Sequence, residues 1–132
     1  KNIIKKAEKL KIKNKLIILY NLQNPYPYIK QSEVLILSSK YEGMGNILVE
    51  SLTLNPPVIS TNCNSGPSEI LLNGKGGDLV KVGDFRSMSK KIILHFQNKK
   101  ILYSKTNFAQ KKLYRFEINN HVNKYKEIFE KI

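Results

Sequence analysis

The feature that most constrains the fold is a strand pattern, a glycine turn and a helix pattern in succession over residues 34–54. Residues 34–37 form a short, continuous apolar run, which is typical of a strand buried on both faces of a parallel sheet. The turn at residues 42–45 holds two glycines, which allow a positive φ or a close approach of the backbone to a ligand. Asn46 is a good N-cap, and we expect a helix over residues 47–54. Such a unit aims free backbone N–H groups and the positive end of a helix dipole at a phosphate.

Two carboxylates frame this turn. Glu42 lies on the loop, and Glu50 lies about one turn into the expected helix, on the side that could face the same crevice. A diphosphate bound in the turn would leave one acid for hydroxyl groups on each side of it.

The rest of the chain alternates helix and strand patterns. Before the turn we expect an amphipathic helix at residues 2–10, a strand at 15–20, and a short helix that ends near Ser32. We expect Tyr26 and Tyr28 in that short helix to pack under the next helix; contact with a nucleotide base is the alternative. After the turn we expect strands at residues 58–60 and 78–80 and helices that begin at Pro67 and after Asp84.

The C-terminal part reads as helical. The helix after Asp84 shows an apolar stripe of core type, and residues 99–113 form a surface helix. The final helix, at about residues 117–131, carries a second apolar stripe that we expect to dock on another domain. His95 and His121 are interpreted as structural or exposed, because the sequence places no acid or second histidine to make a site with them. The two stripes are Phe85, Met88, Ile92 and Phe96, and Ile118, Val122, Tyr125, Phe129 and Ile132.

These patterns predict one α/β domain over residues 1–132, with a Rossmann-like parallel sheet flanked by helices. Ligands of such sheets bind at the carboxyl ends of the strands, where residues 42–46 would lie. Glu69 is expected to cap the helix at Pro67 and to take no part in catalysis.

The net charge of +13 comes from the flanks of the chain, because residues 33–83 carry three lysines against five acids. A solvated lysine-rich surface is the favoured interpretation, peripheral contact with an anionic membrane comes second, and no nucleic-acid motif is present. A single cysteine, Cys63, excludes an internal disulfide and fits a reducing compartment. No apolar run approaches the roughly 20 residues that span a membrane, and no signal peptide is visible. We therefore expect a cytoplasmic location, with contact at the inner face of the plasma membrane as a further option.

Three segments resemble the donor-binding, C-terminal domain of the family-4 retaining glycosyltransferases of the GT-B fold. They are SKYEGMGNILVES (residues 39–51), PVIST (57–61) and SGPSEI (65–70). The mark of that family is a pair of glutamates separated by seven residues, here Glu42 and Glu50. The resemblance extends from about residue 12 to the C-terminus, and it implies the C-terminal half of a GT-B fold whose first βα unit is missing.

The resemblance implies a role for each residue of the turn. Glu50 would bind the ribose hydroxyls of a nucleotide sugar, expected to be a UDP-sugar, and Glu42 would act as the catalytic residue that contacts the transferred sugar. Backbone N–H groups of Gly43, Met44, Gly45 and Asn46 would hold the sugar and diphosphate. No cofactor and no divalent metal are implied, because the family neutralises the leaving group with protein groups.

The resemblance also implies a function. The expected activity is transfer of a hexose or N-acetylhexosamine to a glycan or lipid-linked acceptor of the cell envelope, such as capsule, lipopolysaccharide or O-antigen. The family's acceptor domain and its Arg–Lys diphosphate clamp match no part of this sequence, so we expect no turnover unless an N-terminal glycosyltransferase half is supplied. The alternative is an inactive remnant or split-gene fragment that binds a partner or a membrane surface.

Overall fold

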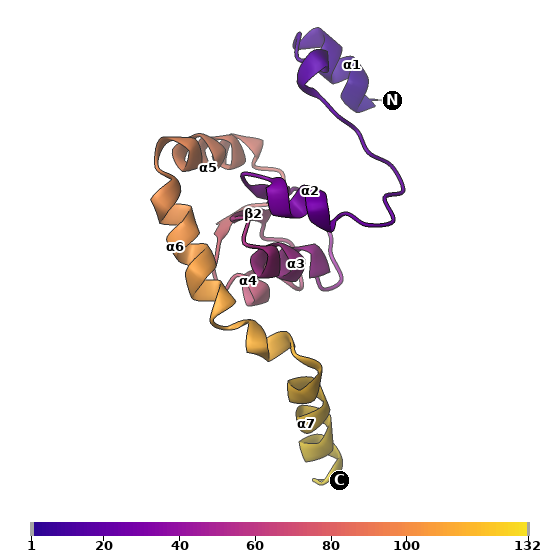
Figure 1. Ribbon diagram of the computed structural model, residues 1–132, viewed down its shortest axis with the longest axis vertical. Coiled ribbons are helices and arrows are strands. Elements are labelled where there is room, and N and C mark those ends of the chain that lie inside the picture. The colour runs from indigo at the N-terminus through magenta and orange to yellow at the C-terminus, as the bar shows by residue number, and fades with distance from the viewer. Residues whose placement is uncertain (1, 132) are drawn as a thin grey trace.

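The computed structural model describes residues 2–131 and shows a central α/β body with a helical arm at each end of the chain (Figure 1). The elements in chain order are α1 (Asn2–Lys9), η1 (Lys13–Lys15), α2 (Tyr26–Gln31), β1 (Leu35–Leu37), α3 (Asn46–Leu54), β2 (Val58–Thr61), α4 (Pro67–Ile70), β3 (Asp78–Val80), α5 (Phe85–Gln97), α6 (Lys99–Gln110), η2 (Leu113–Phe116) and α7 (Ile118–Phe129).

Within residues 2–131 the strands form one parallel sheet in the order β1–β2–β3. Leu35 at the start of β1 lies opposite Val58 in β2, and Ile59 of β2 lies opposite Asp78 in β3. Every residue of the central strand β2 is buried, as expected for a strand covered on both faces. The α/β, Rossmann-like class predicted from the alternating patterns is confirmed.

The core lies between α3, β2 and α4. Leu48 and Leu52 are one turn apart on α3, and both are fully buried against Val58 and Ile70. Burial of each such leucine contributes about 1.5–3 kcal/mol to folding. The helix that follows the glycine turn is therefore anchored along its length, which fixes the position of its N-terminus.

Helix α3 ends as its sequence predicts. Asn55 adopts the left-handed conformation, with φ 84°, which asparagine tolerates better than most residues. Pro56 follows, and its carbonyl accepts a hydrogen bond from the buried Ser51 hydroxyl at 3.1 Å. This bond ties the helix to the connection that leads into β2.

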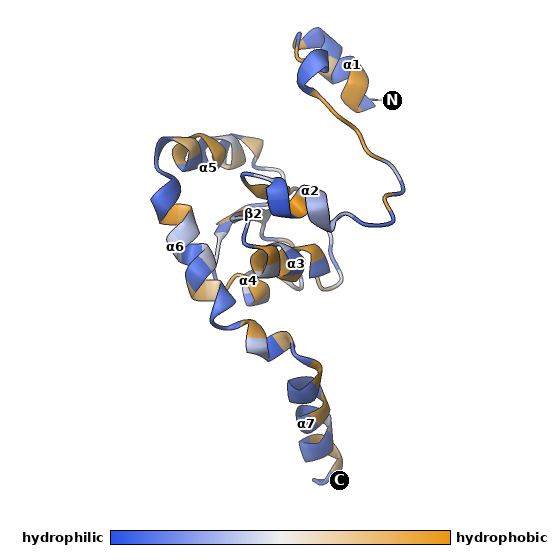
Figure 2. Ribbon diagram, viewed as in Figure 1, coloured by the Kyte–Doolittle hydropathy of each residue, from blue (hydrophilic) through white to orange (hydrophobic). Residues whose placement is uncertain are grey.

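The N-terminal segment matches the sequence patterns only in part. Helix α1 is confirmed, but the strand expected at residues 15–20 is wrong. The backbone N–H of Leu16 closes the η1 turn on the Lys13 carbonyl at 3.1 Å, and residues 16–20 take part in no β-ladder. A strand needs a neighbour for its hydrogen bonds, and here Ile17 and Tyr20 remain 82% and 74% exposed. Figures 1 and 2 show this partly hydrophobic connection running apart from the sheet.

Helices α5 and α6 form at the expected places, but the stripe predicted for α5 is wrong at both ends. Phe85 and Phe96 are 74% and 57% exposed, whereas Met88 and Ile92 are half-buried. The buried residue of α5 is His95. The face that packs on β2 and β3 is thus shorter than the apolar pattern indicated.

Helix α7 projects away from the body, and its apolar stripe is exposed (Figure 1). Ile118, Tyr125 and Phe129 are 76%, 63% and 71% exposed. Ile132, the last member of the expected stripe, lies outside the described residues. Docking of this stripe on another domain stays a prediction.

Over the part of the chain that the structure describes, no helix is long and apolar enough to cross a membrane.

Candidate functional site

The site is built on the turn between β1 and α3. Gly45 has φ 78°, in the left-handed region, and it is the N-cap of α3. Asn46, expected as the N-cap, is instead the first helical residue. Gly45 takes the N-cap position because the chain reverses at the residue with positive φ, and glycine adopts that conformation without a Cβ penalty. Gly43 and Met44 precede it on the exposed part of the turn.

No side chain caps the N-terminus of α3. The first backbone bond of the helix runs from the Leu48 N–H to the Gly45 carbonyl at 2.9 Å. The N–H groups of Asn46 and Ile47 come before that bond and so have no partner inside the helix. An uncapped helix N-terminus of this kind favours an anion.

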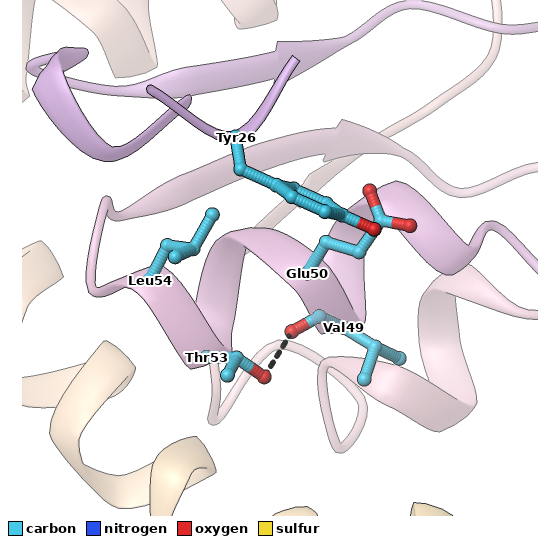
Figure 3. Close-up of a pocket in the computed structure, with 5 residues that line it drawn as sticks. All are labelled: Tyr26, Val49, Glu50, Thr53 and Leu54. Atoms are coloured by element: carbon cyan, nitrogen blue, oxygen red, sulfur yellow. Dashed lines mark hydrogen bonds between the residues drawn. The ribbon is translucent and has the colours of Figure 1, made fainter. Parts of the chain in front are cut away.

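The two candidate acids occupy different places around this terminus. Glu42 lies on the loop and Glu50 on the second turn of α3, and both are half-buried. Glu50 lines a hollow of about 270 Å³ together with Val49, Thr53, Leu54 and Tyr26 of α2; Glu42 does not line it. Figure 3 shows the Tyr26 ring lying across α3 with its hydroxyl directed toward the Glu50 carboxylate.

The expectation that Tyr26 and Tyr28 pack under the next helix is wrong: Tyr26 lies against α3 but remains 48% exposed, and Tyr28 is 55% exposed. An open aromatic face beside a carboxylate can receive a planar group. The sequence pattern did not join Tyr26 to Glu50, because the two residues are 24 positions apart.

The loop that carries Glu42 is anchored from β2. The buried Thr61 hydroxyl lies 2.6 Å from the Ser39 carbonyl and 3.4 Å from that of Leu37. Thr61 thus fixes the backbone just after β1, at Ser39, which lies three residues before Glu42. Sequence reasoning missed this contact.

A second polar cluster lies at the other end of the sheet, just before β1. Glu33 Oε1 lies 3.1 Å from His95 Nε2 and 2.9 Å from Lys99 Nζ. The hydrogen bond from Lys99 is the main cause that lowers the pKa of Glu33 below its ordinary 4.5; partial burial opposes it and the bond to His95 supports it. His95 is structural, as expected, but an acid does pair with it. The cluster lies at the amino ends of the strands and is separate from the glycine turn.

The cap expected from Glu69 is wrong: Glu69 lies in the first turn of α4, but no side-chain hydrogen bond caps that helix. Residues 2–131 bring together no group of three or more His, Cys, Asp or Glu side chains that could hold a metal ion. That the reaction needs no metal stays a prediction.

Comparison with known proteins shows the family. The family model described as "Glycosyl transferases group 1" matches residues 1–112. The lipopolysaccharide 1,6-galactosyltransferase of Escherichia coli K12 is 34% identical over 110 residues, which cover 74% of this chain and 30% of the relative. The capsular polysaccharide biosynthesis glycosyltransferase CapM of Staphylococcus aureus is 30% identical over 77 residues, covering 58% of this chain and 20% of CapM.

The fold has a close structural counterpart. A solved structure of Anabaena Alr3699/HepE in complex with UDP-glucose superposes with a TM-score of 0.86 at 17% identity, covering 99% of this chain and 36% of that protein. The chain thus spans about a third or less of each of these proteins. It belongs to the group 1 glycosyl transferases and has the fold of a GT-B C-terminal domain.

Proposed function

We propose that the chain binds the nucleotide-sugar donor of a retaining glycosyltransferase that builds a cell-envelope glycan, either capsule or lipopolysaccharide. The observation that carries the proposal is the uncapped N-terminus of α3 behind Gly45, with Glu50 one turn further along the same helix. The relatives that act on capsule and lipopolysaccharide give the substrate class. Neither the family match nor these relatives favour the non-enzymatic alternative.

In this proposal the diphosphate of a UDP-sugar lies on the turn. The N–H groups of Gly43 to Asn46 donate to the phosphate oxygens, and the dipole of α3 favours the charge that grows on the leaving diphosphate. Donors fixed by a packed helix need no reorganisation during transfer, which is what makes them effective in catalysis. The likeness to HepE supports the fold, and the UDP-glucose in that structure motivates the choice of ligand.

The two acids then take separate roles. Glu50 accepts hydrogen bonds from the ribose hydroxyls at the edge of the hollow that it shares with Tyr26. Glu42, on the loop outside that hollow, contacts the transferred sugar. A glycan or lipid-linked acceptor would approach from the Glu42 side. It would be bound by a second domain, which residues 1–132 do not resemble.

The test is a titration of the ¹⁵N-labelled chain with UDP-glucose, followed by backbone amide shifts. We expect shifts concentrated at Gly43, Gly45 and Asn46, with a dissociation constant in the high-micromolar to millimolar range, roughly −4 to −6 kcal/mol. Glu42→Gln should weaken UDP-glucose more than UDP, because the acid contacts the sugar. If millimolar UDP-glucose leaves the three amides unmoved, the proposal is wrong.

A further inference from the structure

The backbone of a second loop, which ends at Gly66, packs against the glycine turn at residues 42–45. Gly66 has φ +91°, and a Cβ built on it would lie 2.0 Å from the Met44 carbonyl oxygen and 2.6 Å from the carbonyl carbon. No side chain fits at that distance, so the backbone of residue 66 packs directly on the backbone of the turn. Met44 lies between the two glycines of the turn, and its carbonyl shares one planar peptide unit with the Gly45 N–H, so a contact that fixes the carbonyl also fixes the direction of that N–H.

The loop has rigid support of its own. Pro67 follows Gly66 and opens α4, and the Ile70 N–H donates to the Gly66 carbonyl at 2.8 Å. The Ile70 side chain reaches under the turn, where its Cδ1 lies 3.9 Å from the Cβ position of Gly45. The last carbonyls of α4, those of Glu69 and Ile70, each accept from the Arg115 guanidinium at 3.4 Å. Helix α4 thus supports the turn at two points.

We infer that Gly66 is a positioning residue for donor binding: it sets the direction of the N–H groups at residues 44–46 through its contact with the Met44 carbonyl. The inference rests on the proposed function, since those N–H groups are the ones assigned to the diphosphate. Gly66 itself does not touch the ligand.

The experiment compares Gly66→Ala with Gly83→Ala. Both glycines have positive φ, +91° and +82°, so alanine is strained at either position. A Cβ at Gly83 meets nothing within 4 Å. Only the Gly66 variant should therefore displace the turn.

The first measurement needs no ligand. Backbone amide shifts of residues 44–46 should move in Gly66→Ala and stay in place in Gly83→Ala, although strain lowers the melting temperature of both. Unmoved amides in a folded Gly66→Ala chain would overturn the inference, whatever the chain binds.

The second measurement compares UDP with uridine. Gly66→Ala should weaken UDP by about tenfold or more, because bonds to charged phosphate oxygens are lost, and should leave uridine unchanged. Equal weakening of both ligands would point to general damage and would also overturn the inference. If the unmodified chain binds no UDP, the proposed function fails, and the ligand-free shifts still decide the role of Gly66.

A second variant covers the case in which Gly66→Ala does not fold. Arg115→Met removes the bonds to the α4 carbonyls and introduces no clash. It should move the backbone amide shifts of Gly45 and Asn46, with the amide shifts of β2 unchanged as the control. Unmoved shifts at the two turn amides would contradict the support that α4 gives to the turn.

Discussion

Replacing Glu50 by alanine tests its proposed contact with the ribose, because the substitution should change ligand affinity while leaving the stability of the fold nearly unchanged. Glu50 is half-buried at the edge of the hollow on α3, and within residues 2–131 its carboxylate makes no hydrogen bond or ion pair that supports the fold. Alanine is the best helix former, so the free energy of unfolding should change by less than about 0.5 kcal/mol. Any loss of affinity in Glu50→Ala then comes from a lost contact with the ligand and not from a destabilised fold.

Two effects of opposite sign decide the magnitude. A hydrogen bond from a ribose hydroxyl to a carboxylate contributes about 1.5–3 kcal/mol, which is roughly tenfold to 150-fold in Kd. Against this, removing a negative charge near a diphosphate relieves a repulsion of about 1 kcal/mol across solvent. Because the hollow is open at one side, we place the net loss near the lower end, at about tenfold.

The assay is amide-shift titration with UDP and with its 2′,3′-dideoxy analogue. The dideoxy ligand reports the repulsion alone, so Glu50→Ala should bind it as well as or better than the unmodified chain. Glu127→Ala on α7 removes one acid far from the turn and serves as the matched control for net charge. Equal losses for the two ligands, or no loss for UDP, would refute the assignment of Glu50.

Three further results follow from the structure. Thr61→Val keeps the side-chain shape but removes the hydroxyl that bonds the Ser39 carbonyl, so it should cost about 1 kcal/mol in chemical denaturation and broaden the amide signal of Glu42; an unchanged denaturation midpoint would contradict this. The lowered pKa of Glu33 means that its contribution to stability is present above its ordinary pKa of 4.5 and is lost as the pH falls below that value. Melting temperatures from pH 3 to 7 should thus fall less steeply at the acid end in Glu33→Gln, and parallel curves would argue against the tie to Lys99. Tyr125→Asp should leave the melting temperature unchanged, because the ring is 63% exposed on α7, while it weakens any association through that helix as measured by sedimentation.

The parts of the fold that sequence reasoning predicted are those set by neighbours along the chain. The strand–turn–helix unit depends on an apolar run, two glycines and the stop at Asn55, all within about 20 residues. Positive φ at Gly45 and Asn55 follows from residue type alone. The one error in this unit, one residue at the N-cap, arose because Asn46 and Gly45 both suit a helix start.

Most of the remaining errors concern contacts between distant residues. The expected strand at residues 15–20 has the right composition, but β structure needs a partner, and none lies beside it among residues 2–131. The pairing of His95 with Glu33 joins positions 62 apart, and helix periodicity carries no information about such a partner. Likewise, Phe85 and Phe96 fit a helical stripe, although the sheet below α5 is too short to cover both ends of that helix.

The same contrast applies within the site. Its proposed ligand contacts lie between Glu42 and Glu50, which is why a motif could identify them. The geometry of those contacts depends on Tyr26, Thr61 and Gly66, which come from three other parts of the chain. A sequence that keeps both glutamates but carries a side chain at position 66 cannot keep the Met44 carbonyl where it lies here, because the first added carbon would be 2.0 Å away. We therefore expect the glutamate pair to support donor binding in this chain only while position 66 is glycine.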